Sequence, residues 1–313
     1  MNRLAPEQSA ASKPLQMLFL MIGLAAVSFS AIFIEWSTAP APIIGMYRLW
    51  MSVCVFLPAA WRAKGQLKDM TRRDFSLVLL SGLFLGLHFL FWIQSLKETS
   101  VASSMIIISL EPIFVLIGAF FLFREHIRLH GLVSMIIAML GVVLVASGDF
   151  GRGREHVYGD VLSLIGTLAV SVYMLAGQQV RKRVSSSLYN VLVFFVAGFV
   201  LFLYSLATAK PLLHYTGQNW LMFALLAVVS TVLGHGIFNW LLDRVRATTV
   251  AMTILGEPVV AIVFAMLLLN QPINLLQGIG GLVCLLSVYW FLRYSANKSD
   301  DKTYPPSQET QSA

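Results

Sequence analysis

Two stretches of this chain repeat one another: ISLEPIFVLIGAFFLF at 108–123 and ILGEPVVAIVFAMLLL at 254–269. Each carries a Glu-Pro pair inside a long apolar run, so that Glu111-Pro112 aligns with Glu257-Pro258. Trp92 and Trp240, which each end the preceding apolar run, align as well. The alignment divides the chain into two related halves.

The composition predicts an integral membrane protein. Apolar residues make up 58% of the 313 residues and charged residues 12%, against about 45–50% and 25% in soluble domains. The net charge of +7 comes from short Lys and Arg clusters between apolar runs, which does not form the basic face of a nucleic-acid-binding protein. Neither cysteine lies in a cluster that could hold a metal. We therefore expect no nucleic-acid partner and no metal.

The apolar runs predict ten membrane spans. A bilayer core of about 30 Å needs about 20 apolar residues per helix. Ten runs meet this length: 15–34, 41–60, 75–95, 99–123, 131–148, 160–180, 188–208, 220–242, 247–269 and 274–294. The expected fold is therefore all-α, with ten transmembrane helices and short connections.

The distribution of positive charge predicts the orientation. With the N-terminus inside, the inner segments carry 17 Lys and Arg and the outer segments four, which favours cytoplasmic termini at both ends. Five helices per half is an odd number, so the second half must enter the membrane inverted. We expect repeats at 15–148 and 160–294, an external linker at 149–159, and cytoplasmic tails at 1–14 and 295–313, the latter disordered.

Inverted repeats are typical of secondary transporters, whose substrate site lies at the midplane between the halves. The chain has no Gly-x-x-x-x-Gly-Lys phosphate loop and no Cys/His cluster, so we expect neither ATP hydrolysis by that route nor a cofactor. Transport would then draw its energy from an ion or solute gradient.

Three stretches add a family resemblance: GMYRLW (45–50), SLKETSVASSMIIISLEPIFVLIGAFFLFRE (95–125) and RATTVAMTILGEPVVAIVFAMLLLNQPI (246–273). Together with the five-plus-five plan, they resemble the drug/metabolite transporter superfamily, specifically its EamA family, over about 15–294. The resemblance implies a multi-pass carrier in the inner (cytoplasmic) membrane that moves small organic solutes, in many members outward. Amino acids and other metabolites are among the solutes that it implies.

Glu111 and Glu257 are the two carboxylates expected at mid-membrane. Ionisable residues there cost several kcal/mol and usually have a function. The following Pro112 and Pro258 each remove a backbone donor and predict a helix kink, which supplies polar backbone to a midplane site. Two interpretations stay open: the carboxyls carry coupled protons and contact the solute, or they stay protonated and cap kinked backbone.

Polar side chains form stripes on three expected helices. In the run 160–180, at 100° per residue, an arc of about 80° holds five residues: Asp160, Ser163, Thr167, Ser171 and Gln178. Ser100 and Ser104 share the face of Glu111, and Thr249 and Thr253 lie toward Glu257. Such a stripe lines either water or another helix, because Ser and Thr can return their hydroxyls to their own helix.

Matching helices of the two halves carry His88 and His235, with Trp92 and Asn239 one turn further. The histidines could relay protons and the tryptophan could stack on a solute; packing histidines and an interface tryptophan are the alternatives. Arg48, roughly 10 Å deep at 1.5 Å per residue, either holds a carboxylate substrate, snorkels to the surface or pairs with one of three acids: Glu35, Asp160 or Glu111.

The resulting prediction is a transporter, not an enzyme, that exports amino-acid-like or drug-like solutes across a lipid bilayer by alternating access, with the proton as a candidate coupling ion. The alternative is a membrane enzyme, sensor or channel that uses the mid-membrane carboxylates. The sequence leaves open whether the chain works as a monomer or a homodimer.

Overall fold

The computed structural model describes residues 13–99, 101–124, 129–147, 157–269 and 275–297, and every regular element within them is helical. The elements are α1 (Lys13–Glu35), α2 (Ala41–Arg62), η1 (Lys64–Lys68), α3 (Arg72–Glu98), α4 (Val101–Ile108), α5 (Glu111–Phe123), α6 (Leu129–Ser147), α7 (Val157–Val180), α8 (Ser186–Ala207), α9 (Gly217–Leu225), η2 (Leu226–His235), α10 (Gly236–Leu241), α11 (Ala247–Ile254), α12 (Glu257–Leu269) and α13 (Leu275–Asn297). The expected linker 149–159 and the two tails lie largely outside the described residues.

Within the described residues, seven helices are long and apolar enough to cross a membrane: Pro14–Glu35, Ala41–Arg62, Arg72–Glu98, Val157–Val180, Ser186–Ala207, Gly217–Leu241 and Ala247–Leu268. Three further apolar helices are shorter: Glu111–Phe123, Leu129–Leu144 and Gly278–Arg293. The all-helical membrane class is therefore confirmed, while the number of ten crossings stays a prediction.

Both Glu-Pro pairs start a new helix. α4 and α5 are separated by two residues, as are α11 and α12, and the second helix of each pair begins at Glu111 or Glu257. Pro112 and Pro258 have no N–H, so neither can donate to the carbonyl four residues earlier. At both positions where we expected kinks, a two-residue turn separates the helical segments, and α11 and α12 together still form one candidate span, Ala247–Leu268.

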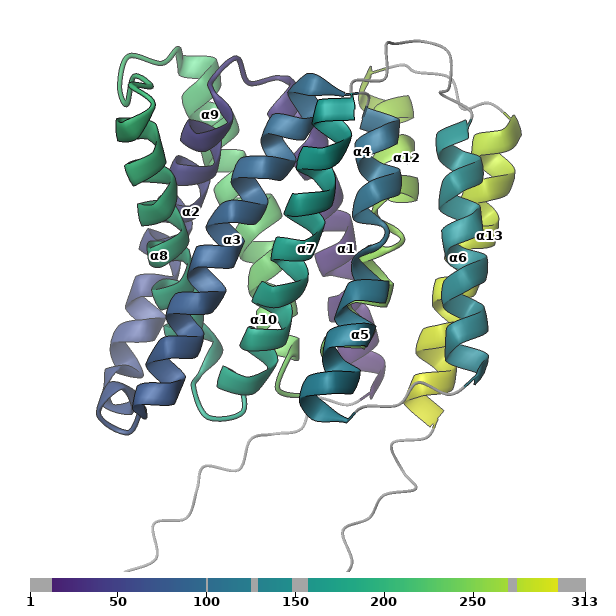
Figure 1. Ribbon diagram of the computed structural model, residues 1–313, viewed down its shortest axis with the longest axis horizontal. Helices are drawn as coiled ribbons and strands as arrows, with labels where there is room; N and C mark the ends of the chain where they lie inside the picture. Colours follow the sequence, from purple (N-terminus) through teal and green to yellow (C-terminus); the bar gives the residue numbers. More distant parts are fainter. Residues whose placement is uncertain (1–12, 100, 125–128, 148–156, 270–274, 298–313) are drawn as a thin grey trace, which may run out of the picture.

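Helices from the two halves pack against each other: α3 with α7, α1 with η2, α2 with α8, and α6 with α13. In Figure 1, α2, α3 and α8 occupy one edge of the molecule, α6 and α13 the other edge, and α1, α7 and α10 the middle. The start of α1 and the end of α13 both lie at the lower end of this view. The middle of the bundle is thus built from segments far apart in the sequence.

A π-helical segment, η2, interrupts the long helix between α9 and α10. Within it, the Thr231 hydroxyl donates to the Leu226 carbonyl five residues back, at 2.9 Å. From α2, the Ser52 hydroxyl donates to the Ala227 carbonyl at 3.1 Å. π segments often mark functional sites, and this one ends at His235, which was predicted as a site residue.

A close helix crossing on α6 provides a stability prediction. A Cβ added at Gly141 would lie 2.7 Å from both the Gly280 oxygen and the Cys284 nitrogen. These are backbone atoms and cannot swing aside, so Gly141→Ala should lower the stability by about 1–3 kcal/mol, seen as a lower Tm of the purified protein. Gly278→Ala is the control because a Cβ there meets nothing within 4 Å. A Gly141→Ala protein that melts like the parent would contradict the crossing.

Candidate functional site

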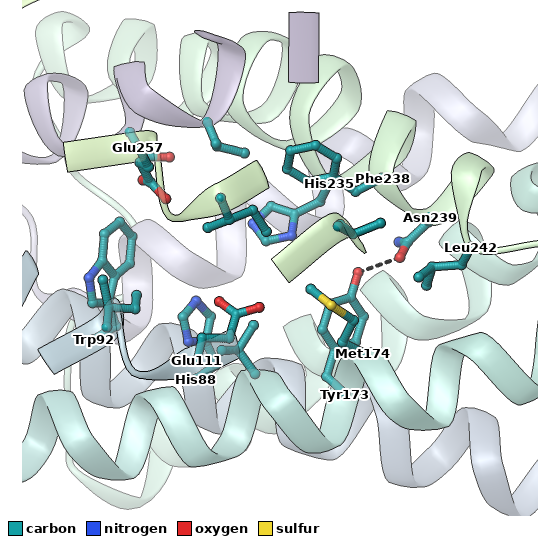
Figure 2. A pocket seen from close by; sticks show the side chains of 16 residues that line it. His88, Trp92, Glu111, Tyr173, Met174, His235, Phe238, Asn239, Leu242 and Glu257 are labelled. Carbon is teal, nitrogen blue, oxygen red and sulfur yellow. Dashed lines mark hydrogen bonds between the residues drawn. The ribbon is translucent and has the colours of Figure 1, made fainter. Parts of the chain in front are cut away.

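A cavity in the middle of the bundle is lined by residues of α1, α3, α4, α5, α7, η2, α10, α11 and α12 and by Leu242, which follows α10 (Figure 2). Six residues predicted from the sequence line it together: Glu111, Glu257, His88, His235, Trp92 and Asn239. Three large side chains that the sequence analysis did not select join them: Tyr173, Met174 and Phe238. Ile108 and Ile254, the residues whose carbonyls lose a donor to the prolines, line it as well.

The two carboxyl groups approach the cavity from different helices, Glu111 from α5 and Glu257 from α12 (Figure 2). Glu111 is 2% exposed and Glu257 6%. The two side chains repel one another electrostatically, and the cation that attracts Glu257 is Arg48. The Oε1 atom of Glu111 has no hydrogen-bond partner among the described residues. A buried polar atom without a partner is costly, so Glu111 is a candidate contact for a ligand.

The His88 ring is fixed in orientation by its hydrogen bond and its stacking. Its Nδ1 lies 3.0 Å from the Gly166 carbonyl oxygen, which can only accept, so Nδ1 carries the hydrogen and Nε2 of the neutral ring is an acceptor. The ring stacks on Trp92 with centroids 5.7 Å apart and planes 7° apart. Trp92 in turn has an indole N–H without a partner among the described residues. The pair presents aromatic surface and polar atoms to the same space.

A buried polar cluster joins α7, α8 and α10. We call it the Arg181 cluster, and its members are Tyr173, Arg181, Asn190, Asn239 and Asp243. The Tyr173 hydroxyl donates to Asn239 Oδ1 at 2.6 Å, and Asn239 Nδ2 donates to Asn190 Oδ1 at 2.7 Å. Arg181 donates from Nε to the Asn239 carbonyl at 2.7 Å and forms an ion pair with Asp243 at 3.3 Å. Burial lowers the pKa of the Arg181 guanidinium from its ordinary value, and the Asp243 carboxylate opposes that shift.

At the opposite end, polar contacts join α3 to its neighbours. Lys97 Nζ donates to the Ala39 carbonyl at 2.6 Å, in the turn between α1 and α2. The Thr99 hydroxyl donates to Asp160 Oδ1 at 2.9 Å, which places Asp160 at the start of α7 and outside the cavity lining. The helices around the cavity are therefore tied together by polar contacts at both ends.

The described residues of the predicted polar stripes are not among those that line the cavity; they bond to their own helix or to a neighbouring helix. On α7, Thr167 and Ser171 donate to the carbonyls four residues back, at 2.7 and 2.8 Å. Ser163 donates to the Ser104 carbonyl at 3.1 Å. The remaining stripe residues behave alike: Gln178 accepts from the Ala247 N–H at 2.7 Å, and Thr253 donates to the Thr249 carbonyl at 3.0 Å. These placements fit the packing interpretation, while Ser100 lies outside the described residues.

Arg48 is fully buried, so its guanidinium does not snorkel to the surface. Its Nε donates to the Thr231 hydroxyl at 3.0 Å, and its Cζ lies 4.2 Å from the centroid of the Phe89 ring. Both of its terminal nitrogens lack a partner among the described residues. Its electrostatic partner is Glu257, which is none of the three acids considered from the sequence. Arg48 is not among the residues that line the cavity.

Sequence reasoning missed Tyr173 and Arg181 for different reasons. Tyr173 lies on α7 outside the arc of the polar stripe. An aromatic residue in an apolar span does not by itself indicate a binding site. Arg181 was counted only as an orienting loop charge. The sequence did contain one signal for Arg181: an acid, Asp243, follows the predicted span 220–242 and could pair with it. Among the described residues, no group of three or more His, Cys, Asp or Glu could hold a metal.

One family model and several curated proteins match this chain. The model of the EamA-like transporter family matches residues 14–147 and 157–293. The chain belongs to the EamA-like transporter family. The resemblance seen in the sequence is thereby confirmed, and the protein is a multi-pass membrane protein of a transporter family.

Curated relatives of this EamA-like protein are named as transporters. An uncharacterized transporter of Archaeoglobus fulgidus is 26% identical over 72% of this chain and 80% of its own length. The uncharacterized transporter YxxF of Bacillus subtilis is 22% identical over 88% of each chain. A probable amino-acid metabolite efflux pump of Escherichia coli is 28% identical over 59% of this chain and 64% of its own. These names speak against an enzyme.

A solved crystal structure shares the fold of this EamA-like protein. It superposes with a TM-score of 0.74 and covers 92% of this chain and 100% of its own, at 15% sequence identity. At that identity the likeness concerns the fold alone.

Proposed function

We propose that this EamA-like protein is a secondary active transporter that exports small organic solutes, amino-acid-like or drug-like, by alternating access. One observation carries the proposal: both Glu-Pro helix breaks, one from each half, meet at a single cavity between the halves. Discontinuous helices at a midplane site are typical of transporters with inverted repeats. The polar contacts at the two ends of the bundle are the candidates to open in turn.

The packing of the helices supports two inverted repeats of five helices. In the proposed repeat, α1 corresponds to α7, α2 to α8, and α3 to the helix that contains η2. The packing of α3 against α7 then corresponds to the packing of η2 against α1. The packing of α3 on α8 has its counterpart in η2 on α2. The proposed protein crosses the inner membrane ten times, with both termini in the cytoplasm.

The proton is the proposed coupling ion, with the cavity carboxyls as its binding groups. A buried carboxyl that loses and gains a proton changes the charge of a site of low dielectric constant, where charge strongly affects the binding of a solute. Exchange of a proton from outside for a solute from inside would drive export without ATP. Membrane enzyme, sensor and channel functions have no specific observation in their favour.

Cysteine accessibility tests the proposed function. In a chain with Cys54→Ala, Met174→Cys places a thiol on the cavity lining, and Leu168→Cys places one on the exposed side of the same helix, facing lipid. We expect a charged, membrane-impermeant thiol reagent to reach position 174 from both sides of the membrane. A pH gradient should raise the rate from one side and lower it from the other.

The variant at Leu168 should stay unlabelled, because a charged reagent does not enter the hydrocarbon region. The remaining Cys284 is 0% exposed and should not react. Labelling of position 174 from one side alone under every condition would contradict alternating access.

A further inference from the structure

The charges around the cavity are unbalanced. Two of the side chains that line it are carboxyls, and none of the lining residues that the structure describes is Lys or Arg. An anionic solute would enter a desolvated space lined by carboxyls, which cannot neutralise it, whereas a cation could pair with a deprotonated carboxyl. The lining thus favours a cationic solute over an anionic one.

The two carboxyls are not equivalent, despite their matching places in the repeats. Glu257 has a buried counter-charge in Arg48, which lies behind Phe89 and His235. The described residues provide no such cation for Glu111, whose electrostatic neighbour is the like-charged Glu257. Its Oε1 also lacks a hydrogen-bond partner there. Glu111 is therefore the carboxyl left free for a ligand.

Other groups around Glu111 also suit a cation with an apolar body. The Tyr173 hydroxyl is engaged by Asn239, so Tyr173 offers the cavity mainly its ring. Trp92, stacked on His88, and Phe238 supply further aromatic surface, and aromatic faces attract cations. Hydrogen-bond acceptors are also present: Nε2 of His88 is one. The backbone carbonyls of Ile108 and Ile254, two lining residues, are others, because Pro112 and Pro258 have no N–H to donate to them.

From this arrangement we propose that the cavity selects organic amines in their ammonium form, with an aromatic or other apolar body. Glu111 binds the ammonium group, the rings of Trp92, Tyr173 and Phe238 surround the body, and Glu257 serves as the fixed counter-charge of Arg48. This inference rests on the proposed transport function and names the class of solute that the same site takes.

Three probes that share one ring and differ in charge test the selection: phenethylammonium, 2-phenylethanol and 3-phenylpropionate. Binding to the purified full-length protein is measured by calorimetry, and the shift in Tm with each probe provides a second readout on the unaltered chain. We expect phenethylammonium to bind at least about tenfold more tightly than the other two, the effect of one charge-assisted hydrogen bond. It should also raise the Tm the most.

Two variants separate the roles of the carboxyls. Glu111→Gln, which keeps the size of the side chain, should weaken phenethylammonium binding about tenfold and remove its advantage over 2-phenylethanol. The matched control, Glu98→Gln, makes the same exchange at the end of α3, outside the cavity lining, and should keep that advantage. The Tm of each variant without probe shows that it is folded.

Three results would overturn the amine proposal: equal or tighter binding of 3-phenylpropionate, no binding of any probe to the unaltered protein, or a folded Glu111→Gln protein that retains the preference. The proposed transport function is judged separately by the labelling of Met174→Cys. Alternating accessibility together with a preference for the anion would keep transport and reject the amine.

Discussion

Glu111→Gln should slow proton-driven export of an ammonium solute by about tenfold or more and abolish its response to the pH gradient. The expected size is that of a lost charge-assisted hydrogen bond of about 1.5–3 kcal/mol. Glutamine cannot take up the proton that, in the proposed cycle, enters from the acidic outside and displaces the solute. The buried Oε1 of Glu111, without a partner among the described residues, is the atom at which the two would compete.

Proteoliposomes with an imposed pH gradient provide the measurement. The unaltered protein should move phenethylammonium when the solute-free side is acidic and stop when an ionophore removes the gradient. Because one cation exchanges for one proton, a membrane potential alone should have little effect. Flux through Glu111→Gln that still follows the pH gradient would rule out this coupling role.

Other ionisable groups around the cavity remain in that variant, and they come from different helices: Glu257 of α12, His88 of α3, Tyr173 of α7, His235 of η2 and Arg48 of α2. Of these, Glu257 is the other carboxyl and the alternative site for the coupled proton. The Glu98→Gln control should retain the response to the gradient. Loss of the response in Glu257→Gln, together with its retention in Glu111→Gln, would move the coupling role to Glu257.

Asp243→Ala should lower the stability of the protein by about 3–5 kcal/mol, the usual consequence of removing one partner of a buried ion pair. Arg181 is 4% exposed and would keep its bonds to the Asn239 and Val184 carbonyls while losing the carboxylate 3.3 Å away. Carbonyls satisfy its N–H groups but cannot neutralise its charge. The Tm and the denaturant midpoint of the purified protein measure the loss.

A second ion pair near the same end of α7 supplies the matched control. Arg183 lies 3.8 Å from Asp74, and its side chain is 67% exposed, so Arg183→Ala should change the stability by less than about 1 kcal/mol. Replacing both buried partners, with Arg181→Met and Asp243→Ala, should recover part of the loss because the buried charge of Arg181 is removed. Arg244, the other cation that pairs with Asp243, is 18% exposed and keeps contact with solvent. Equal effects of Asp243→Ala and Arg183→Ala would show that the Arg181 cluster is not a buried electrostatic contact.

The residues that line the cavity were predictable where their chemistry is unusual for a membrane span. Glu111 and Glu257 were predictable because a carboxyl within an apolar run is costly to bury, and because each precedes a proline. Tyr173 and Phe238 could not be predicted this way, because aromatic side chains pack equally well against lipid, protein or a solute. Tyr173 reaches the cavity because its hydroxyl finds Asn239 on α10, a residue 66 positions away.

The stripe on α7 shows where periodicity stops being informative. Thr167 and Ser171 share a buried face of the helix, as their spacing predicts. The spacing does not predict whether another helix or a water-filled cavity lies opposite that face. Ser163 of the same stripe meets Ser104 of α4, while Thr167 and Ser171 donate to carbonyls of their own helix. The stripe therefore faces a packed helix instead of the cavity.

The sequence by itself determined the membrane class, the positions of the helices, their breaks and the family, because each of these follows from local composition, spacing and proline chemistry. Only the tertiary structure decided which polar groups meet. It placed Arg48 near enough to Glu257 to interact electrostatically, buried Arg181 against Asp243 and left Oε1 of Glu111 without a hydrogen-bond partner among the described residues. These outcomes depend on distances between helices remote in the sequence, which no local pattern contains.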